Sequence, residues 1–340
     1  MKVVFRVDAS VQMGSGHLMR CLTLAQELQQ RGVQARFICG DHLGNLNDWL
    51  QSKGIAITVL SKASGIDVAT DAEQTISALS MDRPDWMVVD HYGLDIEWEQ
   101  RLRPFVGRIL VIDDYTGRRH DCDTLLDQNY AGEDGQRYCG LVPDDCRMLI
   151  GPSFAVLRKE FSELRQKVRR RERLENVLVF FTGGDDQGET LKAMRAVEIF
   201  GQVKRVDVVV GRLNPHNDAI KSKCDELDWG FHCQVDYMPT IISKADLVIG
   251  AGGSSNWERC ALGVPALVAI LADNQATIAQ DLDSAGVVIN LGWAHSLTPD
   301  DYAQALKSFD LRRLSDMSDK ALKIIDAVGA SRVADALLHL

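Results

Sequence analysis

A glycine-containing loop that ends in a histidine is the stretch whose residues are best suited to ligand binding or catalysis. It runs from Asp8 through Gly14 and Gly16 to His17, between an apolar strand expected at 2–8 and an amphipathic helix. Free backbone N–H groups and the positive end of the helix dipole favour an anionic ligand in such a loop. The same dipole disfavours an imidazolium, so His17 is expected to be neutral and able to act as a base. The structural alternative is a histidine that only caps or packs the turn.

Two charged residues, Arg6 and Asp8, share one face of the otherwise apolar first strand, near its C-terminal end. Parallel α/β sheets place their sites at this edge. Because a buried charge is costly without a partner, two interpretations stay open. The two side chains pair with each other, or they orient His17 or a substrate.

The glycine pair also fits the start of a dinucleotide-binding fingerprint, G-x-G-x-x-G, with Asp41 as the ribose ligand. The third glycine of that fingerprint is replaced by Met19. Since that glycine allows helix and strand to approach closely, a methionine weakens the interpretation. No nicotinamide or other cofactor is expected.

Two further glycine loops follow strands in the second half of the chain. The sequence GAGGSS at 250–255 leaves room for a diphosphate. Glu258 beyond it either completes a capping box with Ser255 or binds the vicinal hydroxyls of a ribose. The other loop contains Gly183 and Gly184, which suit a phosphate site or an ordinary turn between strand and helix. Thr182 stands where glycine or another small residue is expected in this loop, and Asp185 and Asp186 add negative charge near a diphosphate.

Two other groups of polar side chains receive no catalytic role. The first gathers metal-type ligands within a short span: Asp113, Asp114, His120, Cys122 and Asp123. Their spacing matches no standard metal site, so no metal is expected. The second group, Asp90, His91 and Tyr92, follows another strand and could line a ligand site, although a histidine in such a loop is more often solvated.

The composition indicates a protein that does not bind nucleic acid or an anionic membrane. The 340 residues carry 38 Lys and Arg against 48 Asp and Glu, a net charge of −10. No signal peptide or membrane-spanning stretch is recognised, so a cytoplasmic protein is expected. The eight cysteines form no C-x-x-C pair and are expected to be reduced. A monomer is compatible with the sequence, which leaves the oligomeric state open.

Val- and Ile-rich runs alternate with helical segments, which is typical of α/β domains with parallel sheets. We expect two such domains, facing each other across a cleft that holds the ligand. The expected division is 1–155, a charged helical linker at 156–175, 176–315, and C-terminal helices at 316–340. The arginine run at 169–171 is interpreted as part of a solvated helix. Strands are expected near 2–8, 34–39, 56–60, 86–90, 108–113, 147–150, 176–181, 205–210, 231–234, 246–250, 265–270 and 287–290.

Four segments resemble the UDP-2,4-diacetamido-2,4,6-trideoxy-β-L-altropyranose hydrolases of pseudaminic acid biosynthesis. They are RVDASVQMGSGHLMRCLTLAQEL, VIDDYTGRRHDCDTLLDQNY, GPSFAVLRKEF and IGAGGSSNWERCALGVPALVAILADNQ. The resemblance implies a GT-B-like fold, similar to the N-acetylglucosaminyltransferase of peptidoglycan synthesis, with the nucleotide mainly on the C-terminal domain. It also implies metal-independent hydrolysis of a UDP-sugar at the anomeric C–O bond, with inversion, releasing UDP and the free sugar.

The resemblance makes His17 the catalytic base. It assigns the diphosphate and ribose to the loop at 252–258, with Glu258 as the ribose ligand, and it gives Asn256 and Trp257 no role. The expected substrate-binding residues are Arg6, Asp8, Gly14, Gly16, Gly183, Gly184, Gly253, Ser254, Ser255, Glu258, Asn274 and Gln275. The exact sugar rests on the resemblance alone. A glycosyltransferase using a UDP-sugar donor and a non-catalytic nucleotide-sugar-binding protein are the alternatives.

Overall fold

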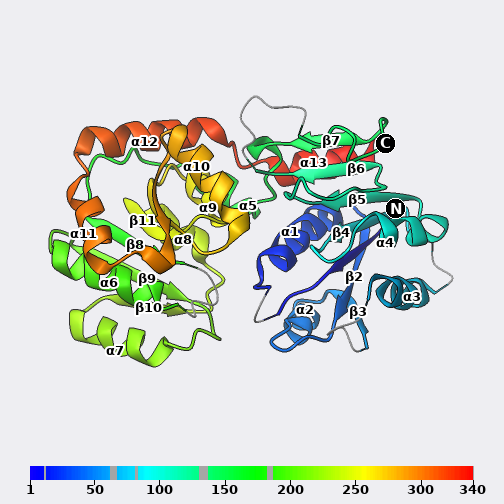
Figure 1. Ribbon diagram of the computed structural model, residues 1–340, viewed down its shortest axis with the longest axis horizontal. Helices are drawn as coiled ribbons and strands as arrows, with labels where there is room; N and C mark the ends of the chain where they lie inside the picture. Colours follow the sequence, from blue (N-terminus) through cyan, green and yellow to red (C-terminus); the bar gives the residue numbers. More distant parts are fainter. Residues whose placement is uncertain (11–12, 62–66, 81–82, 130–136, 182–186, 340) are drawn as a thin grey trace. The chain divides into compact units, whose positions relative to one another are not determined.

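The computed structural model describes residues 1–339 except 11–12, 62–66, 81–82, 130–136 and 182–186. The chain forms two compact units, each built around a parallel sheet (Figure 1). Unit 1 combines Met1–Val156 with Val328–Leu340, and unit 2 comprises Leu157–Ala327. The predicted α/β class with two Rossmann-like parallel-sheet domains is confirmed.

The sheet of unit 1 has seven strands in the order β3-β2-β1-β4-β5-β6-β7. The inner strands are almost wholly apolar because helices cover both faces: α1 and α13 contribute to the core on one face, and α3 and α4 to the core on the other. The strands are β1 Lys2–Val7, β2 Gln34–Gly40, β3 Ala56–Leu60, β4 Trp86–Asp90, β5 Arg108–Ile112, β6 Thr124–Asp127 and β7 Arg147–Ile150. The helices are α1 Gly16–Gln30, α2 Asn47–Ser52, α3 Val68–Leu79, α4 Ile96–Leu102 and α13 Gly329–Leu338, with short 3₁₀ turns at Arg103–Phe105 and Pro152–Phe154.

Helix α1 shows why the first loop lies where it does. Its predicted apolar face, with Leu18, Cys21 and Leu28 among its members, is buried against the sheet. The helix ends before Gly32, whose φ of +80° suits glycine and few other residues. The N-terminal turn of α1 therefore lies at the C-terminal edge of the sheet, where β1 ends.

Strand β6 was not predicted. Its four residues, TLLD, are all buried, and the run is too short and too closely flanked by aspartates to stand out in the sequence. It pairs in parallel with both β5 and β7. This additional strand places Asp127 at the same sheet edge as the ends of β4 and β5.

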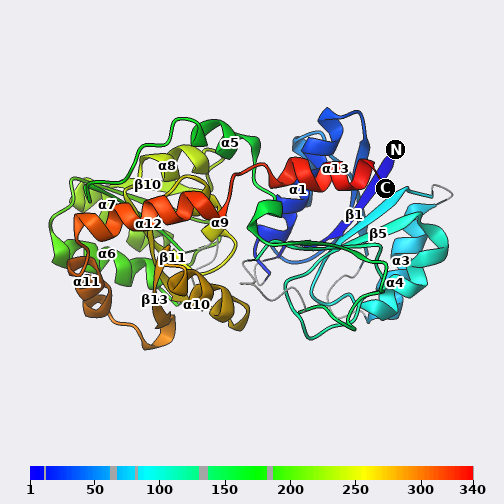
Figure 2. The same cartoon turned by 90° about the horizontal axis from the view of Figure 1, so that it is seen from above.

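Helix α13 packs against α1 although more than 300 residues separate their starts (Figure 2). The Trp86 indole N–H donates to the Leu337 carbonyl at 3.1 Å, and Val333 is fully buried in the same core. A Cβ on Gly329 would lie 2.3 Å from the Ala155 carbonyl oxygen, so glycine is required where this helix begins. The segment expected at 316–340 is thus divided between the units: its first part, with the end of α12 (Leu311–Ile324), belongs to unit 2, and its last part, with α13, belongs to unit 1.

Unit 2 has a six-stranded parallel sheet in the order β10-β9-β8-β11-β12-β13. This order repeats the Rossmann-like arrangement. The strands are β8 Asn176–Phe180, β9 Arg205–Val210, β10 Gly230–Cys233, β11 Leu247–Ala251, β12 Ala266–Ile270 and β13 Val288–Trp293. The helices are α5 Lys159–Arg165, α6 Glu189–Phe200, α7 Asn217–Leu227, α8 Met238–Lys244, α9 Ser255–Ala261, α10 Ala276–Ser284, α11 Pro299–Lys307 and α12 Leu311–Ile324, with 3₁₀ turns at Asp273–Gln275 and Ala294–Ser296.

The arginine run at 169–171 differs from its predicted form. Helix α5 ends at Arg165, and the run that follows is tied to the body of unit 2. Arg171 is buried and donates to the carbonyls of Ala245 and Ser243, and burial lowers its pKa to about 10. Arg169 pairs with the buried Asp246 at 2.6 Å. The interpretation as a solvated helix was wrong because a buried carboxylate and unpaired carbonyls needed these cations.

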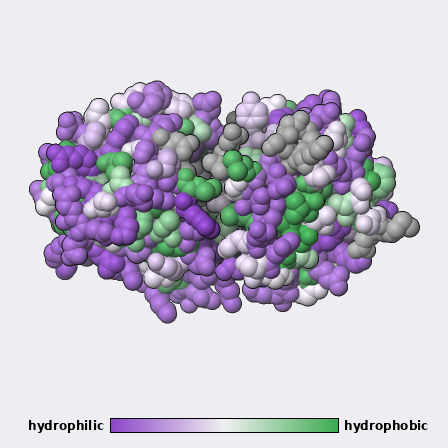
Figure 3. Space-filling model, turned by 90° about the horizontal axis from the view of Figure 1, so that it is seen from below, coloured by the Kyte–Doolittle hydropathy of each residue, from purple (hydrophilic) through white to green (hydrophobic). Residues whose placement is uncertain are grey.

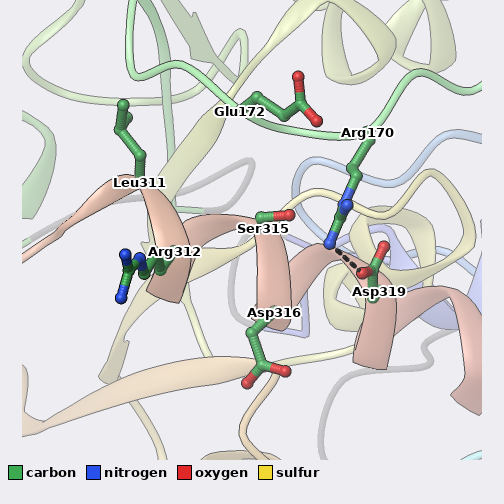
Figure 4. Close-up of a pocket in the computed structure, with 7 residues that line it drawn as sticks. All are labelled: Arg170, Glu172, Leu311, Arg312, Ser315, Asp316 and Asp319. Atoms are coloured by element: carbon green, nitrogen blue, oxygen red, sulfur yellow. Dashed lines mark hydrogen bonds and ion pairs between the residues drawn. The ribbon is translucent and has the colours of Figure 1, made fainter.

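A surface cavity of about 350 Å³ lies on unit 2 between this stretch and α12 (Figure 4). Arg170 reaches toward α12 and pairs with Asp319 at 2.8 Å. The lining residues are Arg170, Glu172, Leu311, Arg312, Ser315, Asp316 and Asp319. None of the sequence-predicted site residues is among them, so we do not include this cavity in the candidate site.

The surface of the molecule shows how polar and apolar residues are distributed. The face seen in Figure 3 is largely hydrophilic, and its apolar side chains gather in small groups. Among the helices that the structure describes, none has the length and apolar character needed to cross a membrane.

Candidate active site

Four buried aspartates mark the C-terminal edge of the unit 1 sheet. Asp8, Asp90, Asp113 and Asp127 end or directly follow the adjacent strands β1, β4, β5 and β6, and each is at most 2% exposed. A buried carboxylate requires a partner. The groups that meet each aspartate therefore show what this edge is built to hold.

Asp90 holds His17, the predicted base. His17 Nδ1 lies 2.5 Å from Asp90 Oδ1, and Arg20 donates to both oxygens of the same carboxylate at 2.6 Å. Burial opposes the charged form of Asp90, but the charge of Arg20 and the hydrogen bonds from Arg20 and His17 outweigh it and hold the pKa of this carboxyl well below its usual range. An ionised Asp90 can only accept, so Nδ1 carries the proton. In the neutral ring the lone pair then lies on Nε2, and the ring is 18% exposed.

Tyr92 fixes the His17 ring from the side. The two ring centroids are 4.9 Å apart, and the rings are nearly perpendicular at 88°. The Tyr92 hydroxyl donates to Asp114 Oδ1 at 2.8 Å, and the Arg118 guanidinium lies over the Tyr92 ring. The group Asp90, His91 and Tyr92 at the end of β4, which received no catalytic role from sequence, thus supplies both the carboxylate and the aromatic neighbour of His17.

Arg6 and Asp8 pair with each other, as the first of the two interpretations predicts. Arg6 Nη1 lies 2.5 Å from Asp8 Oδ1, and Arg6 Nη2 lies 2.5 Å from Asp71 Oδ2. Burial opposes the charge on Arg6, but the two carboxylates raise its pKa above its usual range. Arg6 is therefore a buried counter-ion, and its substrate role stays a prediction.

Two histidines that have no predicted role lie beside the Asp8 carboxylate. Its carboxylate accepts from the Gly40 N–H at 2.6 Å and lies 2.9 Å from His42 Nε2 and 3.3 Å from His91 Nε2. The Gly93 N–H donates to His91 Nδ1, so the proton of a neutral His91 lies on Nε2, facing Asp8. Asp8 thus ties together the loops after β1, β2 and β4. Its role as a substrate ligand stays a prediction.

The two glycines of the first loop have distinct positions. Gly14 has a φ of +71°, and its N–H donates to the Ser10 carbonyl at 2.9 Å, which closes the loop. Gly16 is the first residue of α1. These positions place His17 in the first turn of the helix, as predicted.

Asp113 takes part in an ion cluster around His120. Nδ1 of His120 lies 2.7 Å from Glu99 Oε1, its Nε2 lies 2.9 Å from Asp113 Oδ2, and Arg118 also pairs with Asp113. Carboxylates on both ring nitrogens require a doubly protonated ring. Burial opposes that charge, yet the hydrogen bonds that the ring donates to Asp113 and Glu99 raise the His120 pKa to about 9. Within the described residues, no group of three or more His, Cys, Asp or Glu side chains is arranged to hold a metal ion.

The raised pKa of His120 predicts a pH-dependent stability. The folded value of about 9 exceeds the unfolded value, so the stabilisation is fully present below about pH 6.5 and is lost as the pH rises through about 9. The shift corresponds to about 3 kcal/mol of unfolding free energy. Urea unfolding at about pH 6 and about pH 10 should show this loss in the wild type and not in His120→Gln. His339→Gln, at an exposed position of unit 1, should keep the wild-type dependence. Equal pH dependence in wild type and His120→Gln would contradict the assignment.

In unit 2, the loop after β11 contains Gly253 and Ser254, and α9 begins at Ser255. The helix has no side-chain cap, so the capping-box interpretation of Ser255 and Glu258 was wrong. A capping box would require Ser255 to be the N-cap residue, but Ser254 is the N-cap and Ser255 is already the first residue of the helix. Glu258 instead lies 4.0 Å from Arg158, is 24% exposed, and has its pKa raised by burial.

The buried side chains of Asn256 and Arg259 form hydrogen bonds with the main chain of this loop. Asn256 is fully buried and donates to the Gly252 carbonyl at 2.8 Å, and Arg259 donates to the Ala251 carbonyl at 3.0 Å and to the Asn256 side-chain oxygen. Burial lowers the pKa of Arg259 to about 10. No role was predicted for Asn256. An amide and a guanidinium three residues apart, directly after a glycine loop, were the available signal.

Gln275 lies beside the same loop. Its Oε1 accepts from the Leu271 N–H at 3.1 Å, and a Cβ added to Gly253 would lie 3.5 Å from its Nε2. Asn274 precedes it in a 3₁₀ turn. The structure therefore places Gln275 beside Gly253, and the role of Asn274 and Gln275 toward the phosphates or the sugar stays a prediction. Gly183 and Gly184 lie outside the described residues.

Solved structures define the class of fold. MurG of Acinetobacter baumannii has a TM-score of 0.68 at 14% identity, covering 100% of this chain and 99% of that one. The UDP-GlcNAc 2-epimerase of Neisseria meningitidis bound to UDP-GlcNAc has a TM-score of 0.61 at 14% identity, with full coverage of both chains. The chain therefore has the predicted GT-B-like fold of two Rossmann-like domains.

Comparison with curated proteins shows which known proteins this sequence resembles. The UDP-2,4-diacetamido-2,4,6-trideoxy-β-L-altropyranose hydrolase of Campylobacter jejuni is 28% identical over 217 residues, 64% of this chain and 72% of that protein. The spore coat polysaccharide biosynthesis protein SpsG of Bacillus subtilis is 23% identical over 352 residues, 100% of this chain and 98% of that protein. An uncharacterized protein of Methanocaldococcus jannaschii is 22% identical over 278 residues, 79% of this chain, which spans only 55% of that relative's length. No protein-family model matches. The predicted similarity to the altropyranose hydrolase is confirmed.

Proposed function

We propose that this protein hydrolyses UDP-2,4-diacetamido-2,4,6-trideoxy-β-L-altropyranose at the anomeric C–O bond, in pseudaminic acid biosynthesis. The observation that carries the proposal is the His17–Asp90 pair at the C-terminal edge of the unit 1 sheet, 2.5 Å between Nδ1 and Oδ1. Such a pair fixes the tautomer of a base. The similarity to the Campylobacter hydrolase supports the substrate and the reaction class.

In the proposed step, Nε2 of neutral His17 removes a proton from a water molecule. The water oxygen forms a bond to the anomeric carbon on the face opposite UDP, and the bond from that carbon to the UDP oxygen breaks. The electron pair leaves with UDP, and the anomeric configuration inverts. Asp90 stabilises the imidazolium that forms, because its carboxylate already accepts from Nδ1–H. General-base assistance of this kind contributes about 10²–10⁴-fold to the rate.

We assign the nucleotide to unit 2. Gly253, Ser254 and Ser255 supply main-chain N–H groups and hydroxyls for the diphosphate, and Glu258 accepts from the ribose hydroxyls. The carbonyls of Ala251 and Gly252 are already engaged by Arg259 and Asn256, which supports this assignment because free carbonyls would repel phosphate oxygens. Asn274 and Gln275 are assigned to the phosphates or the sugar. No metal or cofactor enters these steps.

Asn256 gives a test of the nucleotide assignment. Asn256→Ala should weaken UDP binding about tenfold, because the freed Gly252 carbonyl loses its partner and the loop loosens, at a cost of about 1–3 kcal/mol. Isothermal titration with UDP measures the change. Asn217→Ala is the matched control, since Asn217 also donates to loop carbonyls, those of Gly211 and Arg212 after β9. If both variants bind UDP as the wild type does, the assignment of this loop fails.

An assay of UDP release without any acceptor separates the proposed hydrolase from its alternatives. A hydrolase releases UDP in water alone. A glycosyltransferase releases it at a comparable rate only after an acceptor is added. A nucleotide-sugar-binding protein shows a rise in melting temperature with UDP but releases none. Release that depends on an added acceptor, or its complete absence, would overturn the proposal.

A further inference from the structure

Two cysteine sulfurs meet at the edge of the unit 1 sheet where β6 and β7 begin. Cys122 Sγ lies 3.6 Å from Cys146 Sγ, and both residues are free thiols. Cys122 lies two residues before β6, and Cys146 directly precedes β7. Within the part of the chain that the structure describes, this is the one pair of cysteine sulfurs in contact. The other cysteines are Cys21, Cys39, Cys139, Cys224, Cys233 and Cys260.

The two thiols differ in exposure. Cys122 is 1% exposed, whereas Cys146 is partly accessible. The hydrogen bond from the Cys122 thiol lowers the pKa of Cys146, with help from the Leu125 N–H and against the effect of burial. The same contact, together with burial, raises the pKa of Cys122. An accessible thiol with a lowered pKa beside a buried thiol is the arrangement of an attacking cysteine and its resolving partner.

The backbone at this edge favours closure. Thr124 and Arg147 are register partners in the parallel pair β6 and β7, and the Arg147 N–H donates to the Asp123 carbonyl at 2.9 Å. The residues beside both cysteines are therefore held together by strand pairing. A disulfide needs the sulfur separation to shorten from 3.6 Å to roughly 2.05 Å.

We propose that Cys122 and Cys146 are a dithiol site that a hydroperoxide oxidises reversibly to an intramolecular disulfide. The Cys146 thiolate attacks the hydroperoxide, so that an S–O bond forms, the O–O bond breaks, and the leaving oxygen takes a proton as alcohol or water. Cys122 then loses its proton, and its sulfur attacks the Cys146 sulfenic acid. The S–S bond forms, the S–O bond breaks, and water leaves. Two thiols are oxidised, and the hydroperoxide is reduced.

The expected consequence is a more stable unit 1. The disulfide closes a loop that contains Asp127, Arg137 and Tyr138. The Tyr138 hydroxyl is within hydrogen-bond distance of Asp127 Oδ2, at 2.9 Å, and of the Asp113 carbonyl, at 3.0 Å. Closure of a loop of this size restricts the unfolded chain, so the melting temperature should rise by roughly 5–10 °C.

The test is peptide mapping of the full-length protein after treatment with hydrogen peroxide and alkylation of the remaining thiols. We expect the peptides with Cys122 and Cys146 to be linked, with the loss of two hydrogens, and to be separated again by dithiothreitol. The Cys122→Ser variant should stop at a sulfenic acid on Cys146 that dimedone captures. Its melting temperature should not change on oxidation. Cys139→Ser, at an exposed cysteine, should form the disulfide as the wild type does.

Three outcomes would overturn the proposal. They are a disulfide that involves other cysteines, over-oxidation of Cys146 while Cys122 is still alkylated, and recovery of both thiols unmodified. The peptide map of the wild-type protein distinguishes these outcomes from the expected disulfide even if the serine variant does not fold. None of them depends on the catalytic role proposed for His17.

Discussion

Replacing His17 by asparagine is expected to lower the rate of UDP release by about 10²–10⁴-fold while the protein stays folded. The asparagine amide can still donate to Asp90, so the buried carboxylate keeps a partner, but no atom at this position can accept a proton from water. Initial rates with saturating UDP-sugar, together with a melting curve, measure both parts of the expectation.

The control for this experiment is His339→Asn, which replaces an exposed histidine of unit 1. It should turn over at the wild-type rate. The affinity of His17→Asn for UDP should be unchanged, because the nucleotide is assigned to unit 2. A folded His17→Asn protein with near-wild-type turnover would show that His17 is not the base.

Replacing Asp90 by asparagine is expected to have a comparable effect on kcat for a different reason. An amide N–H can donate to His17 Nδ1, which moves the ring proton to Nε2 and removes the lone pair that accepts the proton of water. The expected loss is about 10²–10⁴-fold in kcat, with little change in KM. The variant also leaves Arg20 without its counter-ion, which should lower stability by about 3–5 kcal/mol.

Loss of stability alone would not identify the role of Asp90, so the test needs a second readout. Nitrogen chemical shifts of the His17 ring should report a proton on Nδ1 in the wild type and on Nε2 in Asp90→Asn. Asp127→Asn is the matched control, since Asp127 is equally buried at the same sheet edge but is bound to Tyr138 and Arg137. If both variants lose the same activity and neither changes the ring tautomer, Asp90 is only structural.

The features that could be predicted from the sequence are those that depend on the pattern of neighbouring residues. The apolar face of α1 and twelve of the strands follow from helical spacing and from Val- and Ile-rich runs, and alternation of the two element types indicates parallel sheets. Strand β6 was not predicted because its four buried residues, which lie among aspartates, show too little periodicity. The motif S-x-x-E at Ser255 was misleading because such a match does not fix where the helix begins.

The partners within the candidate site depend on strand order, which local patterns do not contain. His17 and Asp90 are 73 residues apart, and they meet because β4 pairs with β1. The same adjacency brings His91 to Asp8. Asn256 was overlooked because its contact is to a main-chain carbonyl, and the one available signal, its spacing from Arg259 after a glycine loop, does not by itself indicate that contact. The position of His17 in the first turn of α1 was thus predictable, whereas its contact with Asp90 was not.

The most direct test of the proposed reaction is a proton NMR time course of the wild-type protein with UDP-2,4-diacetamido-2,4,6-trideoxy-β-L-altropyranose in buffer without an acceptor. We predict loss of the anomeric signal of the donor, equimolar appearance of UDP and free sugar, and a first-formed sugar of inverted anomeric configuration. An unchanged donor, or a first-formed sugar with retained configuration, would contradict a mechanism in which His17 activates water for direct displacement of UDP.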